Sequence, residues 1–232
     1  MERTEKIGRR LRALTVVLSV LSGVSASGCA RDIQTQFPMG LEPIEDNTAT
    51  LPTSATEPTP ETLTVLMGTQ TLPDGREYSW VHARGYIRAP LARVWSAMRN
   101  AEACADRREV TEFRVTPQSN PAYVQSWSTH NIVRAAATVI FDVEWRHGLA
   151  AGTEQDPQVL AARWQKVRGS SFIELMRGSA SAQRVSDTVT EVSIVYHLGA
   201  FSRTPEHAAL FVRDLFGSWV AVVHDQPLPT YR

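Results

Sequence analysis

The sequence predicts an α+β domain in which a curved antiparallel sheet wraps around one long C-terminal helix, with one or two short helices after the first strand. Three observations predict this arrangement. A long amphipathic helix is expected over residues 204–224, a strand followed by a helix over 78–100, and a succession of strands over 110–200. Because the long helix is the only element large enough to cover an apolar sheet face, the sheet is expected to be built against it.

The helix over 204–224 carries the signals of a helix start and a broad apolar side. Thr204 suits the N-cap, Pro205 suits the first turn, and Glu206 lies at the positive end of the helix dipole. Such a helix is about 30 Å long. Burying its large apolar side chains would contribute on the order of 10 kcal/mol before entropy is counted. The apolar side contains Ala208, Val212, Leu215, Phe216, Trp219 and Val223.

The strand and helix that open the domain precede the main run of strands. Residues 78–88 alternate between small or apolar side chains and polar ones, which is typical of a half-buried strand. Pro90 then opens a helix over 90–100, whose apolar side includes Trp95. A second, short helix is expected around 101–108.

From residue 110 onward, one strand follows another. The clearest is 136–147, where Phe141 and Trp145 alternate with Asp142 and Glu144. Consecutive strands of this kind are expected to form an antiparallel meander with one apolar face. The strands are expected near 110–117, 123–133, 136–147, 159–169, 171–185 and 189–200.

The N-terminus reads as a targeting signal rather than as part of the fold. Five basic residues lie within residues 3–12, and an apolar run follows over 14–24. Small residues then lead to Cys29. This order is typical of a secretory signal, and the apolar run is too short to span a membrane. We therefore expect residues 1–28 to be a signal peptide.

The stretch Ala26-Ser27-Gly28-Cys29 resembles a bacterial lipobox. The resemblance implies that Cys29 is acylated and becomes the first mature residue. Because no Asp follows the cysteine, it also implies a cell-envelope protein anchored in the outer membrane and facing the periplasm. An ordinary signal peptide with a nearby cysteine is the alternative.

Residues 29–62 are expected to be a flexible tether, and residues 63–232 the folded domain. The tether is rich in Pro, Thr, Glu and Ser and shows no apolar period. It contains an apolar group between Phe37 and Ile44, which is expected to pack loosely on the domain or on nothing. As an alternative, this group is a docking peptide for a partner.

Composition and motifs narrow the possible functions. The 232 residues are 43% hydrophobic with no formal net charge, so no nucleic-acid partner is expected. Serine-hydrolase, zinc-protease, phosphate-loop and dinucleotide-binding motifs are missing from the sequence, and the six histidines show no metal-ligand spacing. We therefore expect no catalytic residues of known motif, no metal and no cofactor. Cys104 is expected to be a buried thiol, without a disulfide partner if Cys29 is acylated.

The stretch YIRAPLARVWSAMRN and the helix over 204–224 resemble the opening and the closing helix of the START and polyketide-cyclase-like (SRPBCC) superfamily. The resemblance covers about residues 78–224. It implies a helix-grip fold with a cavity between the sheet and the long helix, used for lipids, sterols, polyketides or other apolar molecules.

Aromatic residues are the candidates for lining such a cavity, although each of them could instead fill the core. For an enzyme, one of His130 and His197 together with Tyr196 would be the first acid–base suspects. Asp142 and Glu144 share the face opposite the apolar one and are expected to be solvated. The cavity candidates are Trp127, Phe141, Trp145, Trp164, Tyr196, Phe216 and Trp219.

Three functions remain open at this point. The leading hypothesis is a lipid-anchored periplasmic protein that binds or carries an apolar small molecule or lipid without catalysis. The second is an enzyme of cyclase, aromatase or hydrolytic type that uses the same cavity. The third is a structural or adaptor domain of an envelope complex, for which the sequence names no protein partner.

The lipid anchor is testable by metabolic labelling. Palmitate should be incorporated into the wild-type protein expressed in a bacterial host, and Cys29→Ser should abolish the label because no thiol remains at the acceptor position. Cys104→Ser, which removes the other cysteine, is the control and should keep the label. Unchanged labelling of Cys29→Ser would show that Cys29 is not the acylation site.

Overall fold

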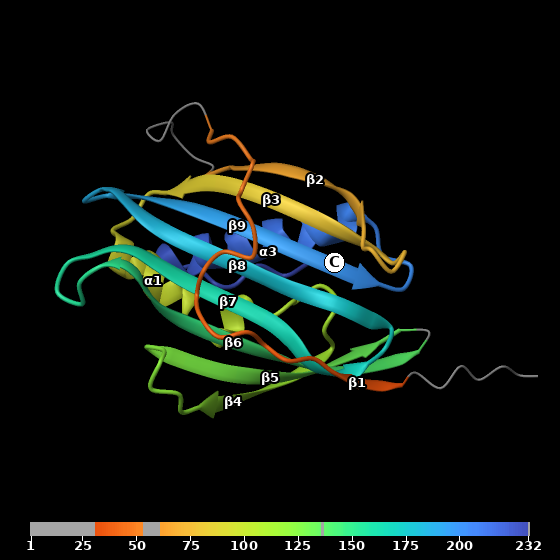
Figure 1. Ribbon diagram of the computed structural model, residues 1–232. Helices are drawn as coiled ribbons and strands as arrows, with labels where there is room; N and C mark the ends of the chain where they lie inside the picture. Colours follow the sequence, from red (N-terminus) through yellow and green to blue (C-terminus); the bar gives the residue numbers. More distant parts are fainter. Residues whose placement is uncertain (1–30, 53–60, 136, 232) are drawn as a thin grey trace, which may run out of the picture.

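The computed structural model describes residues 31–52, 61–135 and 137–231, which form one wide antiparallel sheet with its helices on one face (Figure 1). The predicted signal peptide, Cys29 and residues 53–60 of the predicted tether lie outside the described residues. No helix in the described part of the chain is both long and apolar enough to span a membrane.

Strands β4 to β9 form a meander, and β3 and β2 continue the sheet beyond β9. The spatial order is β2-β3-β9-β8-β7-β6-β5-β4, with every neighbouring pair antiparallel, and β1 pairs with the end of β7. The predicted fold class is therefore confirmed. The strands are β1 Asp32–Gln34, β2 Leu63–Thr71, β3 Glu77–Ile87, β4 Glu112–Gln118, β5 Gln125–Arg134, β6 Thr138–Gly152, β7 Pro157–Ser170, β8 Ile173–Ser186 and β9 Val189–Ala200.

The helices are α1 Leu91–Met98, α2 Ala101–Cys104 and α3 Pro205–Val223. Thr204 precedes α3, and its backbone N–H donates to Nδ1 of His207 at 3.2 Å, which holds the first turn. The apolar side of α3 packs on β2, β3 and β9 and on both short helices. The predicted long helix is thus confirmed, and it covers the half of the sheet that contains β2, β3 and β9.

Strand β6 shows how the sequence pattern sets the two faces of the sheet. Phe141 and Trp145 are buried on the inner face, toward the helices. Asp142 and Glu144 point outward, where their carboxylates pair with basic side chains. The predicted alternation is confirmed. The strand runs on to Gly152, however, beyond its predicted end at residue 147, so only a short turn leads to β7.

The N-terminal segment differs from the expected tether. Residues 31–52, here called the strap, run across the outer face of the sheet from β1 toward β3 (Figure 1). Phe37 and Ala49 are buried, and Asn47 donates to the carbonyl of Ala83. The prediction of a flexible segment is wrong for the strap. The strap shows no apolar periodicity because the sheet holds it chiefly by hydrogen bonds. Polar groups of the sheet make these bonds with the backbone and the polar side chains of the strap.

Candidate functional site

The candidate site is a cavity of about 310 Å³ on the inner face of the sheet, beside the N-terminal half of α3. Its other walls are the turn between β5 and β6, the start of β8, the end of β9 and the segment 106–110 that follows α2. The lining is mainly apolar, as expected for a small-molecule site. It includes Val133, Val139, Ile173, Met176, Leu198 and Phe211.

Polar side chains interrupt the apolar lining, namely Asp106, Arg108, Glu109, Tyr196, Ser202, Arg203 and His207. Tyr196 is only 2% exposed, and its hydroxyl makes no hydrogen bond to any described residue. Burial raises the pKa of Tyr196 above its ordinary value, and the charge of Asp106 adds to the effect. The tyrosine is therefore neutral at physiological pH and its hydroxyl can donate a hydrogen bond to a molecule in the cavity.

Asp106 is another polar group of the cavity. Its Oδ1 accepts hydrogen bonds from the backbone N–H groups of Arg108 at 3.2 Å and Glu109 at 3.1 Å, which fix its position at the cavity wall. Burial, with smaller effects from the charges of Glu109 and Asp214, raises the pKa of Asp106 to about 6. Its carboxyl group therefore changes charge close to physiological pH.

Ion pairs brace the rim of the cavity. Arg203 donates to Glu109 at 3.1 Å, and Arg108 Nε donates to Asp214 of α3 at 2.8 Å. The first pair joins the end of β9 to the segment after α2, and the second joins that segment to α3. Phe201, with 77% of its surface exposed, lies at the same rim. The cavity thus has a braced entrance with an exposed aromatic ring beside it.

Of the seven predicted cavity residues, Phe141 and Tyr196 line the cavity and the other five do not. Those five belong to the closed hydrophobic core, so their assignment to the cavity is not supported by the geometry. Three of the five, Trp127, Trp145 and Trp164, are indoles of neighbouring strands that stack on one another, and the other two are packed into the core from α3. The core residues are Trp127, Trp145, Trp164, Phe216 and Trp219.

The stack runs across the middle of the inner face. The ring centroids of Trp145 and Trp164 are 4.7 Å apart, and those of Trp127 and His147 are 4.3 Å apart. Gly178 opposes Trp164 on the next strand, and a Cβ there would overlap the indole. Burial lowers the pKa of His147 to about 3, so this ring is a neutral part of the stack.

Sequence reasoning missed Asp106 and most of the apolar wall. Phe211 was not recognised because its helical position borders the apolar stripe rather than lying in it. Asp106 lies in an irregular segment where no periodicity marks a burial pattern. The one available signal was the position of residues 105–110 directly before a strand, and that signal does not indicate a cavity.

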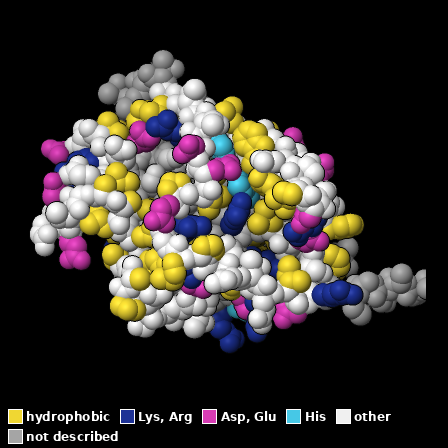
Figure 2. Space-filling view, in the orientation of Figure 1, with side chains coloured by type: hydrophobic (Ala, Val, Ile, Leu, Met, Phe, Trp, Pro, Cys, Tyr) yellow, Lys and Arg dark blue, Asp and Glu magenta, His cyan; other side chains and the backbone are white. Residues whose placement is uncertain are grey.

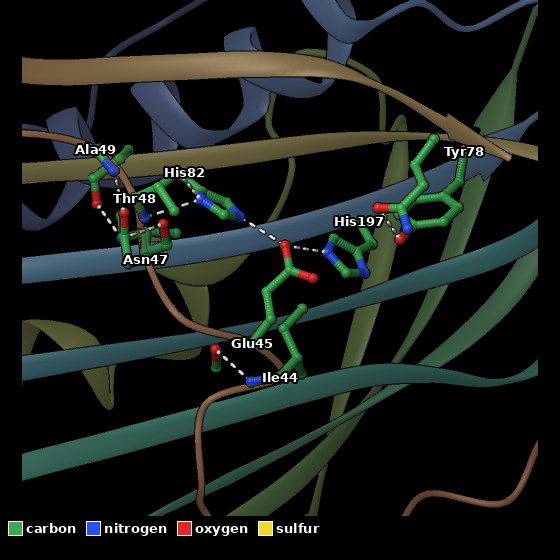
Figure 3. Close-up of polar contacts among 12 residues, drawn as sticks. Ile44, Glu45, Asn47, Thr48, Ala49, Tyr78, His82 and His197 are labelled. Carbon is green, nitrogen blue, oxygen red and sulfur yellow. Dashed lines mark hydrogen bonds and ion pairs between the residues drawn. The ribbon is translucent and has the colours of Figure 1, made fainter. Parts of the chain in front are cut away.

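The three acid–base suspects do not converge. Only Tyr196 faces the cavity. His130 lies on the outer face, where its Nδ1 is 2.6 Å from Asp142. His197 is also on the outer face, beside Glu45 of the strap (Figure 3). Neither histidine is therefore placed to act together with Tyr196 in the cavity, because adjacent strand residues point to opposite faces.

No group of three or more histidine, cysteine or acidic side chains in the described ranges is arranged to hold a metal ion. Cys104 is buried, its Sγ–H donates to the carbonyl of Met98 at 3.2 Å, and burial raises the pKa of its thiol to about 12. The thiol is therefore a protonated core group and not a nucleophile.

The chain matches no protein-family model and no curated protein sequence. Among solved structures, it is similar to the Zhui aromatase/cyclase from Streptomyces sp. R1128, with 14% identity, coverage of 63% of this chain and 94% of that chain, and a TM-score of 0.43. It is also similar to the human StarD13 lipid transfer and protein localization domain, with 11% identity, coverage of 75% and 93%, and a TM-score of 0.47.

A third similar structure is human StAR-related lipid transfer protein 5, with 11% identity, coverage of 73% of this chain and 89% of that chain, and a TM-score of 0.48. These matches are of the two kinds that the sequence resembles, polyketide cyclases and lipid-transfer domains. At such identities and TM-scores, they say nothing about what this chain binds.

The core position of Trp219 yields a stability prediction. Trp219 is fully buried and does not line the cavity. Trp219→Ala should lower the free energy of unfolding by about 3–5 kcal/mol, because it removes a large buried side chain from a closed core. Phe201→Ala, at an exposed position, should change it by about 0.5 kcal/mol or less. Denaturant titration followed by circular dichroism measures both. A small loss in Trp219→Ala would place this indole beside empty space.

Proposed function

We propose that the protein binds an apolar small molecule that carries one hydroxyl group, in the cavity beside α3. The observation that carries the proposal is the apolar cavity of about 310 Å³ with the unpartnered hydroxyl of Tyr196 in its wall. An unpaired polar group in such a place costs free energy unless a ligand or water pairs with it. A ligand hydroxyl would pair with it, and the apolar part of the lining favours hydrocarbon.

The volume supports a compact ligand. About 310 Å³ is at the lower end of the range of small-molecule sites, roughly 300–1,000 Å³. A single acyl chain segment or a small fused-ring molecule suits this space better than a whole two-chain phospholipid. The ligand class is therefore a single-chain lipid, a sterol-like or a polyketide-like molecule.

The polar end of the cavity supports the hydroxyl. Tyr196 can donate to the hydroxyl oxygen of the ligand, and the ligand hydroxyl can in turn donate to the carboxylate of Asp106. The charge of Asp106 raises the pKa of Tyr196, so the two groups interact across the cavity wall. Because the carboxylate accepts a charge-assisted hydrogen bond, the pair would orient the ligand as well as bind it.

An enzymatic function is the second candidate, and the pKa of Asp106 is the observation that favours it. A carboxyl group with a pKa of about 6 in an apolar cavity can give or take a proton near neutral pH. The Asp106 carboxylate would take the proton from a ligand carbon next to a carbonyl group, and Tyr196 would donate a hydrogen bond to the enolate oxygen that receives the electron pair. This chemistry is of the cyclase or aromatase type. Turnover of a polyketide-like substrate that Asp106→Asn abolishes while binding persists would establish it.

The setting of the domain is also part of the proposal. Residues 1–29 have the order of a lipoprotein signal, and Cys29 would hold the protein on the periplasmic side of the outer membrane. A cavity protein on such an anchor would take its ligand from the membrane or deliver it there. The exposed ring of Phe201 at the rim supports an entrance that meets an apolar surface.

Binding is testable with a fluorescent fatty-acid probe and unlabelled competitors. Ala200→Trp should fill part of the cavity and weaken probe binding by roughly tenfold or more. Tyr196→Phe should lower the affinity for a hydroxylated competitor by roughly threefold to tenfold, the effect of one lost hydrogen bond. The affinity for the hydrocarbon analogue of that competitor should stay unchanged. Tyr78→Phe, on the outer face, is the matched control. Equal affinity of the wild type and Ala200→Trp would contradict the site.

The pH dependence tests Asp106 separately. With a pKa raised to about 6, Asp106 is ionised above that pH and protonated below it. Affinity for a hydroxylated ligand should therefore rise as the pH increases through about 6, because the carboxylate is the better acceptor. Asp106→Asn should flatten this profile. Isothermal titration calorimetry at several pH values measures the effect, and a profile that stays steep in Asp106→Asn would assign it to another group.

A further inference from the structure

The rim of the cavity carries apolar side chains that reach the solvent. Phe201 is 77% exposed, and Leu210, on the second turn of α3, is 38% exposed. Phe172 packs its ring beside that of Phe201. All three residues line the cavity, and together they are here called the mouth. Large apolar side chains that gather at one place on a surface indicate contact with an apolar partner.

The strap begins beside this mouth. Arg31 is its first described residue. The carbonyl of Arg31 accepts a hydrogen bond from the N–H of Ser171 at 2.8 Å, and the N–H of Arg31 donates to Ser171 Oγ at 3.1 Å. Strand β1 continues this pairing along β7, with Asp32 opposite Ser170. The start of the strap is therefore fixed to the turn between β7 and β8.

That turn leads directly into the cavity wall. Phe172 follows Ser171 in the sequence, and its carbonyl accepts a hydrogen bond from the N–H of Phe201 at 2.8 Å. The ring centroids of Phe172 and Phe201 are 6.1 Å apart. A short series of backbone contacts thus connects Arg31, at the start of the strap, with both aromatic residues of the mouth.

The docked strap shortens the path from Cys29 to the folded domain. Cys29 lies two residues before Arg31 in the sequence. Two residues of extended chain span at most about 7 Å, whereas a flexible tether over residues 29–62 would span up to roughly 110 Å. A lipid attached to Cys29 would therefore leave the protein close to Arg31, and hence close to the mouth.

The other surfaces of the domain are less suited to a membrane. Figure 1 shows β1 at the end of the sheet where β8 begins and β9 ends, and the turn between β8 and β9 at the opposite end. The outer face carries acidic and basic side chains across its middle (Figure 2), and such groups are costly to place in hydrocarbon. Near β1, the 44% exposed side chain of Ile140 lines a second hollow together with Asp32. Apolar surface and the start of the strap thus share one end of the domain.

We propose that the docked strap keeps the lipid anchor at the mouth, so that the mouth sits on the membrane that holds the anchor. This inference rests on the lipid anchor and the cavity of the proposed function. The partner is the surface of a phospholipid bilayer. Phe201 and Leu210 enter the acyl-chain region, while the ion pairs of the rim stay at the level of the head groups. An apolar ligand then passes between bilayer and cavity without crossing water.

The short path and the apolar contact act together. Because the anchor lies about two residues from the start of the docked strap, the effective concentration of the mouth at the bilayer is high. Burial of one exposed aromatic ring then favours the seated arrangement by roughly tenfold or more. An anchor without a docked strap would let the domain turn in any direction, and a few apolar side chains without an anchor would bind a bilayer only weakly.

Fluorescence quenching in reconstituted vesicles tests the orientation. The mature lipoprotein, in a Cys104→Ser background, is placed in vesicles of phosphatidylethanolamine and phosphatidylglycerol with an environment-sensitive dye on Ser202→Cys, next to Phe201. Spin-labelled lipids should quench this dye, and its emission should shift to the blue. The same dye on Asp187→Cys is the matched control and should stay unquenched. Asp187 lies in the turn at the far end of β8, a strand of 14 residues that spans about 45 Å.

Two insertions separate the docked strap from a flexible tether. Twenty Gly and Ser residues between Ala30 and Arg31 lengthen the path from the anchor to the mouth by about 25 Å on average. The ratio of seated to released molecules, measured by the dye on Ser202→Cys, should then fall by roughly tenfold. The same insertion between Ala55 and Thr56 lies beyond the docked strap and should leave the ratio unchanged. An equal fall with both insertions would overturn the proposal, because the strap would then not set the path.

Removal of the apolar contact tests the mouth itself. Phe201→Ser should lower the ratio of seated to released molecules by roughly tenfold. Val185→Ser, which removes a 50% exposed side chain near the far end of β8, should leave the ratio unchanged. An equal ratio in Phe201→Ser and the parent protein would overturn the assignment of the mouth.

The outcomes separate this orientation from the proposals on which it rests. A dye on Ser202→Cys that stays in water, on protein whose lipid is verified by mass spectrometry, would overturn the orientation and leave the anchor intact. Protein that carries no lipid would overturn the anchor and the orientation with it. Seating is measured without a ligand, so absence of fatty-acid binding in a correctly seated protein would contradict the cavity proposal alone.

Discussion

One helix has to close a sheet that is wider than the helix. Strands lie about 4.8 Å apart and a helix with its side chains is about 10–12 Å across, so one helix covers about two or three strands. The path from β2 to β4 is far wider than that. Helix α3 packs on β2, β3 and β9, and the inner face of the remaining strands needs another cover. The rest of the inner architecture follows from this mismatch.

Large side chains of the sheet itself provide much of that cover. Trp127, Trp145 and Trp164 come from three neighbouring strands and stack on one another in the hydrophobic core instead of opening toward a ligand. Their stacking buries apolar area and gives the rings a favourable offset geometry. The cavity lies beyond the stack, near the first turns of α3, where Tyr196 and Phe141 line it. The position of the cavity is therefore set by the point at which the packed aromatic core ends.

The elements of the fold could be predicted from local pattern, because alternation and helical spacing record which face of each element is buried. Phe141 and Trp145 on one side of β6, with Asp142 and Glu144 on the other, show this directly. The strap could not be predicted in this way. Its contacts are hydrogen bonds from its backbone to side chains far along the chain, such as the bond from Ile44 to Ser179, and these leave no periodic trace.

The site was predictable only in part for a related reason. Aromatic residue type indicates burial, but whether a buried ring touches a cavity depends on its neighbours in space. Trp164 fits tightly because Gly178 opposite it has no side chain, and that pairing is a matter of register. Asp106 depends on an irregular segment that is held by its own backbone hydrogen bonds. Neither fact can be read from the residues taken one at a time.

Register also places the two polar sites of the protein back to back. Tyr196 and His197 are consecutive on β9, so one faces the cavity and the other the strap. On β8, Gly178 pairs with Tyr196 and Arg177 with His197. The same rungs of one ladder thus carry Tyr196 of the cavity on the inner face and the strap contact of His197 on the outer face. Because these rungs are hydrogen-bonded on both sides, a shift of β8 against β9 would disturb both sites together. A change confined to side chains would reach only one of them.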